Sequence, residues 1–304
     1  MKVAIVYDVP GWAYHRRALI LRRYAPQFGD VLLARYNVPD LADLLVDCDL
    51  VYLMAYGACS RIRSLLPAAT ILVCGFNVGA GYRRERYLEL AKSADHVIFN
   101  NFDNWEHHGR PVNSSWISNG VDLAQFYTTG PIITRQPRAL SIGSEYHLVH
   151  NDDLKGTQLL AEIQPALEAA GIVCDFRTVD SNNPPMSADE MRDWYNTGTI
   201  YVVASRHEGT PNPALEAAAC GCAVVATRVG NMPELIRHGV NGFLVDRSPH
   251  GLLEGILQAN AANPAMAVAM AATIEKWDWK YRATQYWDLF TRLVAEKTEK
   301  VAVT

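Results

Sequence analysis

The sequence predicts an α/β protein built from two Rossmann-like halves. Each half opens with a short apolar strand candidate that runs into a glycine-containing turn, residues 3–7 before Gly11 and residues 139–142 before Gly143. Strand and helix candidates then alternate at short intervals, which favours parallel sheets covered by helices. The 304 residues, 49% of them apolar, suffice for two domains of ordinary size.

In the first half, the turn at Gly11 lacks a G-x-G-x-x-G pattern, so no dinucleotide fingerprint is present. A basic helix candidate follows at residues 13–24. Further strands are expected at residues 31–33, 50–54, 71–74, 97–99 and 116–117, and helices at 40–46, 61–66 and 84–92.

A linker at residues 131–137 leads into the second half. Lys155-Gly156 opens a helix candidate that runs to residue 170. Strands are expected at residues 172–176, 200–203, 223–227 and 243–245, and helices at 186–194, 232–237 and 281–293. The expected domains are residues 1–132, joined by 278–304, and residues 133–277.

Composition excludes several classes of protein. The formal net charge is −4, which does not suggest a general polycation for nucleic acid, and no apolar run approaches the roughly 18 residues of a membrane span. The N-terminus enters a strand at once without signal-peptide anatomy, so a cytoplasmic protein is expected. The six cysteines have no zinc spacing and are expected to be small buried residues, although Cys220-Gly-Cys222 could chelate a soft ion.

The most informative stretch is residues 205–216, SRHEGTPNPALE, which follows an apolar run. Asn212 is a suitable N-cap and Pro213 a suitable first helical residue, so the order is strand, tight turn and helix. Such a turn can present backbone N–H groups to an anion such as a diphosphate. Glu208 and Glu216 would then accept hydrogen bonds from hydroxyls on either side. An ordinary connection with solvated glutamates is the alternative.

This stretch resembles the E-x7-E signature of retaining glycosyltransferases of family four, and the resemblance extends over residues 201–245. The text NGVD at residues 119–122, with Phe126 after it, is similar to the end of that family's N-terminal domain. The resemblance implies the GT-B fold: two Rossmann-like domains with parallel sheets facing across a cleft, and a C-terminal helix crossing back to the N-terminal domain.

The resemblance also implies roles for individual residues. Lys155 would hold the donor diphosphate, Glu208 would orient the donor sugar, and Glu216 would accept the ribose hydroxyls. The alternatives to these functional roles are that Lys155 is a solvated lysine at the start of a helix and that Trp12 packs in the core. The expected catalytic residues are Glu208 and Lys155, and no metal or other cofactor is expected. The donor-binding set is Gly143, Lys155, Glu208, Gly209, Thr210, Pro211, Asn212 and Glu216, and the acceptor-side set is Gly11, Trp12 and Asn77.

Three departures from the family pattern matter. Ser144 and Glu145 stand where an arginine for the diphosphate is usual, and residues 75–77 (Gly-Phe-Asn) stand where a histidine is usual. The stretch 174–188 is short, as if a βα unit bordering the nucleobase were deleted.

The expected function is transfer of a sugar from a nucleoside diphosphate sugar to an acceptor hydroxyl, with retention. A nucleotide-sugar epimerase or hydrolase, and a non-catalytic sugar-nucleotide binding module, are the rivals. A glycan or small molecule is the default acceptor. Residues 1–138 carry a net charge of +3, with basic and aromatic residues clustered around 12–23 and 82–87, so modified DNA or an anionic lipid surface entered by Leu19 and Leu21 are alternatives.

Overall fold

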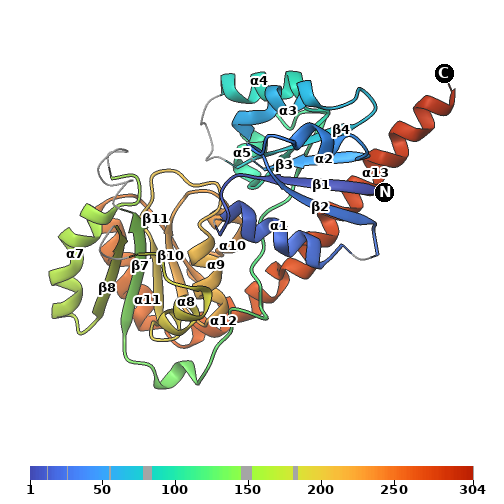
Figure 1. Cartoon of the computed structure of the whole chain (residues 1–304). Helices are drawn as coiled ribbons and strands as arrows, with labels where there is room; N and C mark the ends of the chain where they lie inside the picture. The colour runs from blue at the N-terminus through green and yellow to red at the C-terminus, as the bar shows by residue number, and fades with distance from the viewer. Residues whose placement is uncertain are drawn as a thin grey trace. The chain divides into compact units, whose positions relative to one another are not determined.

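The computed structural model describes residues 1–11, 13–25, 27–54, 56–77, 84–144, 153–180 and 184–303. The chain forms two compact units: Met1–Ser118 with Trp279–Thr304, and Asn119–Asp278 (Figure 1). The predicted boundary after residue 132 differs from this division. Residues 119–126 pack with the second unit because Val121 N donates to Trp277 O at 2.9 Å and Phe126 lies in that unit's core.

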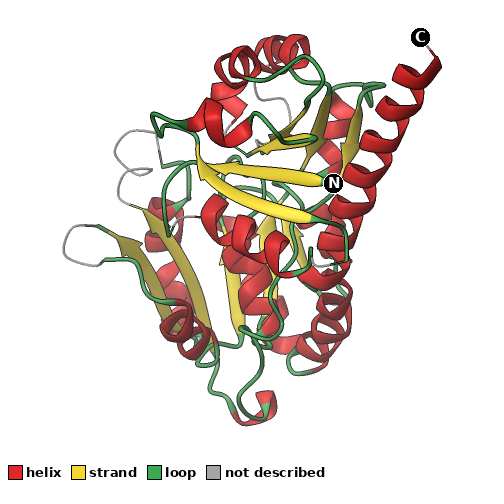
Figure 2. Ribbon diagram, turned by 45° about the vertical axis from the view of Figure 1, so that its right-hand side comes forward, coloured by secondary structure: helices red, strands yellow, loops and turns green. Residues whose placement is uncertain are grey.

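The N-terminal unit contains a six-stranded parallel sheet in the order β2-β1-β3-β4-β5-β6. Its central strands read as continuous apolar runs because helices bury both of their faces (Figure 2). The strands are β1 (Lys2–Tyr7), β2 (Asp30–Arg35), β3 (Leu50–Leu53), β4 (Ile71–Phe76), β5 (His96–Phe99) and β6 (Ser114–Trp116), and the helices are α1 (Ala13–Arg23), α2 (Leu41–Leu45), α3 (Cys59–Leu65), α4 (Arg84–Ser93) and α5 (Phe102–His107).

The C-terminal helix α13 (Trp279–Val303) belongs to this N-terminal unit, as predicted. Trp287, which is fully buried, donates from Nε1 to Leu21 O of α1 at 3.0 Å. Tyr286 and Phe290 are also fully buried, and their rings pack against that of Tyr52 of β3 at tilted angles. Figure 1 shows this helix running along the N-terminal unit beside α1.

The C-terminal unit contains a five-stranded parallel sheet in the order β11-β10-β9-β7-β8. Within the described part of this unit, β8 ends the sheet and leads to α8 with no strand between them, in agreement with the predicted deletion. The strands are β7 (Arg138–Ser144), β8 (Val173–Val179), β9 (Ile200–Val203), β10 (Ala223–Thr227) and β11 (Gly242–Val245), and the helices are α7 (Thr157–Ala169), α8 (Ala188–Tyr195), α9 (Asn212–Ala219), α10 (Met232–Leu235), α11 (Pro249–Ala262) and α12 (Ala265–Ile274).

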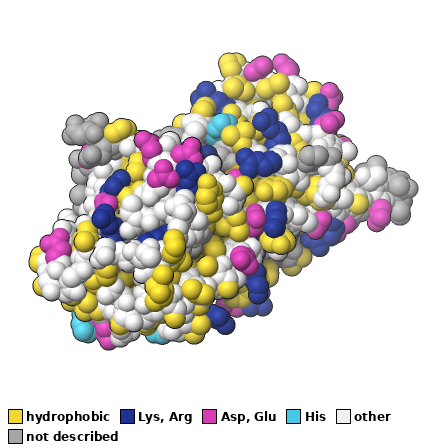
Figure 3. All heavy atoms as spheres, turned by 90° about the horizontal axis from the view of Figure 1, so that it is seen from below, with side chains coloured by type: hydrophobic (Ala, Val, Ile, Leu, Met, Phe, Trp, Pro, Cys, Tyr) yellow, Lys and Arg dark blue, Asp and Glu magenta, His cyan; other side chains and the backbone are white. Residues whose placement is uncertain are grey.

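The surface corrects one expectation about the acceptor. Leu21 is fully buried and Arg17 is 4% exposed, so neither can dip into or contact a lipid surface; Tyr87 is buried as well. On the face shown in Figure 3, basic side chains are interspersed with acidic and apolar ones. In the described residues, no helix combines the length and the apolar character needed to cross a bilayer.

Candidate functional site

The candidate site lies at the carboxyl edge of the C-terminal sheet, where the loop after β9 carries Glu208. Thr227 of β10 donates from Oγ1 to Ser205 O at 2.6 Å and so anchors the start of this loop. Gly230, with φ +53°, approaches the same loop so closely that an added Cβ would lie 2.6 Å from Gly209 O. The glycine is therefore required both by its backbone conformation and by the space available.

Helix α9 begins differently from the expectation. Asn212 is its first residue and Pro211 precedes it, so the prediction of Asn212 as N-cap is wrong by one position. The Asn212 backbone N–H donates to Thr210 O at 2.9 Å, and its side chain accepts from Asn119 Nδ2 at 3.3 Å. Because this N–H is engaged, and because prolines have none, Asn212, Pro211 and Pro213 offer fewer donors to an anion than expected.

Lys155 lies in a short loop, residues 153–156, that leads directly into α7. The Asp153 carboxylate accepts from the backbone N–H groups of Thr157 at 2.7 Å and Gln158 at 3.2 Å, which caps α7. Arg247 joins this loop to the end of β9 by donating to Asp153 O at 2.7 Å and to Ala204 O at 3.0 Å. Neither Asp153 nor Arg247 was predicted from the sequence, although an aspartate just before the start of a helix is a recognisable capping signal.

Glycines bring this loop close to its neighbours. Gly156 has φ +76°, and a Cβ there would lie 2.4 Å from Ala204 O. A Cβ on Gly143, at the carboxyl end of β7, would lie 3.1 Å from Thr157 Oγ1 and 3.5 Å from Lys155 Cβ. The structure therefore brings the predicted donor-binding residues Gly143 and Lys155 together with the β9 loop.

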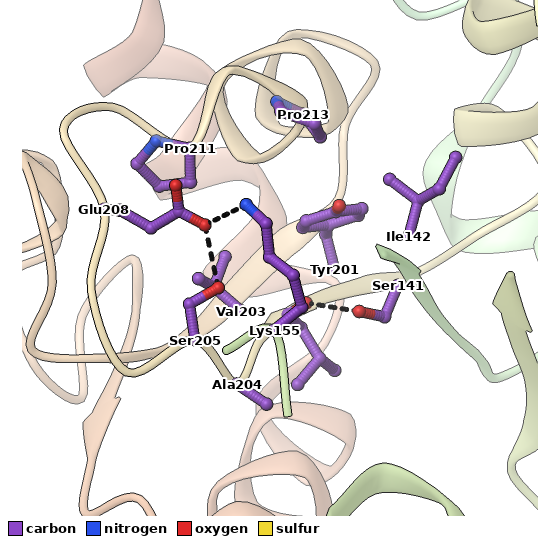
Figure 4. Close-up of a pocket in the computed structure, with 11 residues that line it drawn as sticks. Ser141, Ile142, Lys155, Tyr201, Val203, Ala204, Ser205, Glu208, Pro211 and Pro213 are labelled. Atoms are coloured by element: carbon purple, nitrogen blue, oxygen red, sulfur yellow. Dashed lines mark hydrogen bonds and ion pairs between the residues drawn. The ribbon is translucent and has the colours of Figure 1, made fainter. Parts of the chain in front are cut away.

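Lys155 and Glu208 meet in a pocket that both residues line (Figure 4). Lys155 Nζ donates to Glu208 Oε1, and Ser205 Oγ donates to the same oxygen at 2.8 Å. The side chains of Lys155 and Glu208 are 26% and 12% exposed. They are therefore largely buried, yet a ligand in the pocket can reach them. The pocket therefore offers a cation for phosphate oxygens and an oriented carboxylate for hydroxyls.

Glu216, the second glutamate of the motif, lies on α9 outside the residues that line this pocket. Its Oε2 accepts from the hydroxyl of Tyr195 at 2.9 Å. Tyr195 ends α8 and is fully buried, and burial together with the Glu216 charge raises the pKa of its phenol well above the ordinary value. Tyr195 was not among the site residues predicted from the sequence.

The predicted acceptor-side residues belong to the N-terminal unit. Gly11, with φ +80°, donates from its N–H to His15 Nδ1 at 2.9 Å. Asn77, just after β4, accepts from Arg17 NH1 at 3.2 Å through Oδ1. Trp12 lies outside the described residues.

The described residues contain no group of three or more His, Cys, Asp and Glu side chains placed to hold a metal ion. Cys220 and Cys222 are buried, and burial raises the pKa of each thiol to about 12. A metal-binding cysteine is deprotonated, so this environment opposes the soft-ion alternative.

Residues 155–261 match the family of glycosyl transferases group 1. This segment is therefore similar to group 1 glycosyltransferases. It begins at Lys155 and includes Glu208, Glu216 and Tyr195, so the resemblance to glycosyltransferases is confirmed where the candidate donor site lies.

Relatives and solved structures agree with this assignment. The chain is 46% identical over 155 residues to D-inositol 3-phosphate glycosyltransferase of Pseudarthrobacter chlorophenolicus, covering 42% of this chain and 37% of that protein. It is 32% identical over 126 residues to the Arthrobacter sp. protein of the same name, covering 40% of this chain and 29% of that protein. The chain thus spans well under half the length of these curated relatives.

Solved structures resemble almost the whole chain. Sucrose-phosphate synthase from Thermosynechococcus elongatus has a TM-score of 0.71 at 17% identity, covering 97% of this chain and 100% of that one. Anabaena HepE in complex with UDP and glucose has a TM-score of 0.69 at 15% identity, covering 96% and 100%. At these identities the likeness shows the fold, and it confirms the predicted GT-B fold with two Rossmann-like units.

Proposed function

We propose that the protein is a retaining glycosyltransferase that moves a sugar from a nucleoside diphosphate sugar to an acceptor hydroxyl. The observation that carries the proposal is the meeting of Lys155 and Glu208 at the carboxyl edge of a Rossmann-like sheet, inside the matched glycosyltransferase segment. HepE has been solved with UDP and with UDP-glucose, so uridine nucleotides are the first donors to test.

The chemistry requires stabilisation of a leaving diphosphate. As the bond between the anomeric carbon and the phosphate oxygen breaks, negative charge grows on the diphosphate, and the Lys155 ammonium offsets it. Glu208, oriented by Ser205, accepts hydrogen bonds from donor-sugar hydroxyls. The acceptor oxygen attacks the same face of the sugar, and its proton passes to the leaving phosphate oxygen. This route needs no separate enzymic base and, in our proposal, no metal.

Product analysis tests the proposal against its rivals. The protein would be incubated with UDP-glucose and other nucleotide sugars, with and without candidate acceptors, and the products separated and examined by NMR. We expect transfer that depends on the acceptor, preserves the anomeric configuration and persists in a chelator. Free sugar or an epimerised nucleotide sugar, formed at the same rate without acceptor, would instead identify a hydrolase or an epimerase. Binding without turnover would identify a sugar-nucleotide binding module.

The acceptor is proposed from charge and from the names of relatives. The described part of the N-terminal unit carries Arg16, Arg22 and Arg23 on the exposed side of α1. The sequence relatives are named for D-inositol 3-phosphate, so a phosphate-bearing polyol is the first anionic acceptor to try, beside neutral glycans. A cytoplasmic location remains a prediction.

The salt dependence of binding distinguishes polyanionic acceptors from neutral ones. Retention on duplex DNA or anionic vesicles should weaken with salt, with a log–log slope near −0.9 for each DNA phosphate contacted. If neither surface retains the protein at low salt, both the DNA and the lipid alternatives fail.

A further inference from the structure

Tyr195 connects helix α8 to the second glutamate of the motif. Its hydroxyl donates to Glu216 Oε2 at 2.9 Å, and the side chain is fully buried. Aromatic neighbours enclose the ring: the Trp194 and Tyr201 ring centroids lie 5.2 Å and 5.8 Å away, and that of Phe126 lies 6.1 Å away. The phenol can therefore move little.

The backbone at Tyr195 is anchored as firmly as its ring. Its carbonyl accepts from Gly198 N at 3.1 Å and from Cys222 Sγ at 3.4 Å. The next residue, Asn196, accepts from Arg135 NH2 at 2.8 Å through Oδ1. The phenolic oxygen is consequently a fixed point that holds Glu216 Oε2.

The direction of this hydrogen bond follows from chemistry. An ionised carboxylate can only accept, so the phenol must donate. A phenol whose pKa is raised keeps its proton across the ordinary pH range, so it remains a donor. This hydrogen bond fixes the position of Glu216 Oε2 relative to the buried Tyr195 ring. A binding side chain recognises its ligand with higher specificity when supporting hydrogen bonds fix its rotamer.

We propose that Tyr195 is a positioning residue for ribose recognition: its hydroxyl orients the Glu216 carboxylate toward the ribose hydroxyls of the nucleoside diphosphate donor. This inference rests on the proposed function, because it assumes that Glu216 accepts those hydroxyls. If Tyr195 has this role, its hydroxyl should increase the preference of the protein for ribonucleotides over deoxyribonucleotides. An effect confined to phosphate binding or to turnover is not expected.

The test compares Tyr195→Phe with wild type by calorimetric titration of UDP and 2′,3′-dideoxy-UDP, with GDP and its dideoxy form as a second pair. Tyr195→Phe keeps the buried ring and removes only the hydroxyl. We expect the affinity for the ribonucleotide to fall about tenfold, while the affinity for the dideoxy form stays within twofold. Glu216→Gln should show the same pattern, and the double variant should be no worse than the poorer single variant because both act through one interaction.

Trp194→Phe is the matched control. Trp194 precedes Tyr195 on α8, is buried, and donates from Nε1 to Asp175 Oδ2 at 2.8 Å. Its substitution removes a partly buried hydrogen bond from the same helix and keeps an aromatic ring beside Tyr195, with the Tyr195 hydroxyl and Glu216 unchanged. It should lower thermal stability but leave the ratio of the two nucleotide affinities unchanged.

The outcomes separate this inference from the proposed function. If Glu216→Gln loses ribose discrimination while Tyr195→Phe keeps it, the positioning role of Tyr195 is overturned and the donor site stands. An equal loss of both affinities in Tyr195→Phe, matched by Trp194→Phe, also overturns it, because the effect would then be a general loosening of α8. If wild type binds the ribo- and dideoxynucleotides equally, the ribose role of Glu216 fails and the inference fails with it.

Discussion

Lys155 Nζ and Glu208 Oε1 form an ion pair although the two residues are 53 positions apart and lie on different loops. Each group orients the other in a partly buried setting, and Ser205 holds the shared carboxylate oxygen at 2.8 Å. A donor diphosphate would compete with Glu208 for the ammonium, whereas Ser205 would continue to hold the carboxylate. The pair thus links the position of the cation that we propose for the diphosphate to that of the carboxylate that we propose for the donor sugar.

Removing the cation should slow the chemical step. Lys155→Ala should lower kcat/KM by one to three decades, about 1.4–4 kcal/mol of transition-state stabilisation, because the leaving diphosphate loses its ammonium partner. Steady-state rates of transfer measure this, with Lys276→Ala, an exposed lysine of the same unit, as the control. Rates within twofold of wild type would remove Lys155 from the donor site.

Substitutions of the two glutamates should have different effects on binding and on turnover. Glu216→Ala should weaken binding of the bare nucleoside diphosphate, because ribose contacts exist without the sugar, whereas Glu208→Ala should mainly reduce turnover. Calorimetry with the nucleotide and single-turnover rates with the full donor distinguish the two effects. Equal nucleotide affinity in wild type and Glu216→Ala would contradict the assigned roles.

Gly230 should be sensitive to a single methyl group. Gly230→Ala places a Cβ 2.6 Å from Gly209 O and also strains a backbone with φ +53°, so it should displace the Glu208 loop. We expect a loss of about 1–3 kcal/mol in the free energy of unfolding, together with at least a tenfold loss of activity.

Gly239→Ala is the matched control for Gly230→Ala. Gly239 also has positive φ, +76°, but nothing lies within 4 Å of its added Cβ. Gly239→Ala should lower the free energy of unfolding by about 1 kcal/mol, because of its strained backbone, and should retain activity. Equal activities of the two variants would mean that the close approach of Gly230 does not position the loop.

His96 should make the stability of the N-terminal unit depend on pH. Burial, with a smaller effect of Arg292, lowers the pKa of His96 to about 4. The unfolded chain takes up a proton near pH 6.5, whereas the folded protein takes it up only near pH 4. The contribution of His96 is therefore complete above pH 6.5 and is lost as the pH falls from 6.5 to about 4, on the order of 3 kcal/mol.

Denaturant titrations at several pH values measure this dependence. His96→Gln retains a polar group for the contact with Ser115, 2.9 Å from His96 Nε2, and should flatten the dependence. His250→Gln, which changes a highly exposed histidine, should leave it unchanged. If the His96→Gln curve parallels that of wild type between pH 4 and 6.5, another group carries the effect.

Local patterns in the sequence were sufficient for much of the fold. The spacing of apolar residues and the composition of the short apolar runs predicted most of the parallel strands, because a strand that is buried on both faces is apolar along its whole length. The shortness of the stretch 174–188 predicted the deletion of a βα unit, and among the described residues β8 is the strand at that edge of the sheet. The patterns did not predict α5, α11 or α12. The lipid-surface alternative required Leu21 to be exposed, whereas it is fully buried.

The sequence alone predicted the class of site through its resemblance to family-four glycosyltransferases, which Glu208, Glu216 and Lys155 carry, whereas the spacing of these residues left an ordinary strand-to-helix connection open. Only the tertiary structure decided which groups hold them: Ser205 for Glu208, Tyr195 for Glu216, and Asp153 with Arg247 for the Lys155 loop. Such partners are brought together by the meeting of loops at the carboxyl edge of a parallel sheet. Their hydrogen bonds depend on positions in space that no local periodicity records.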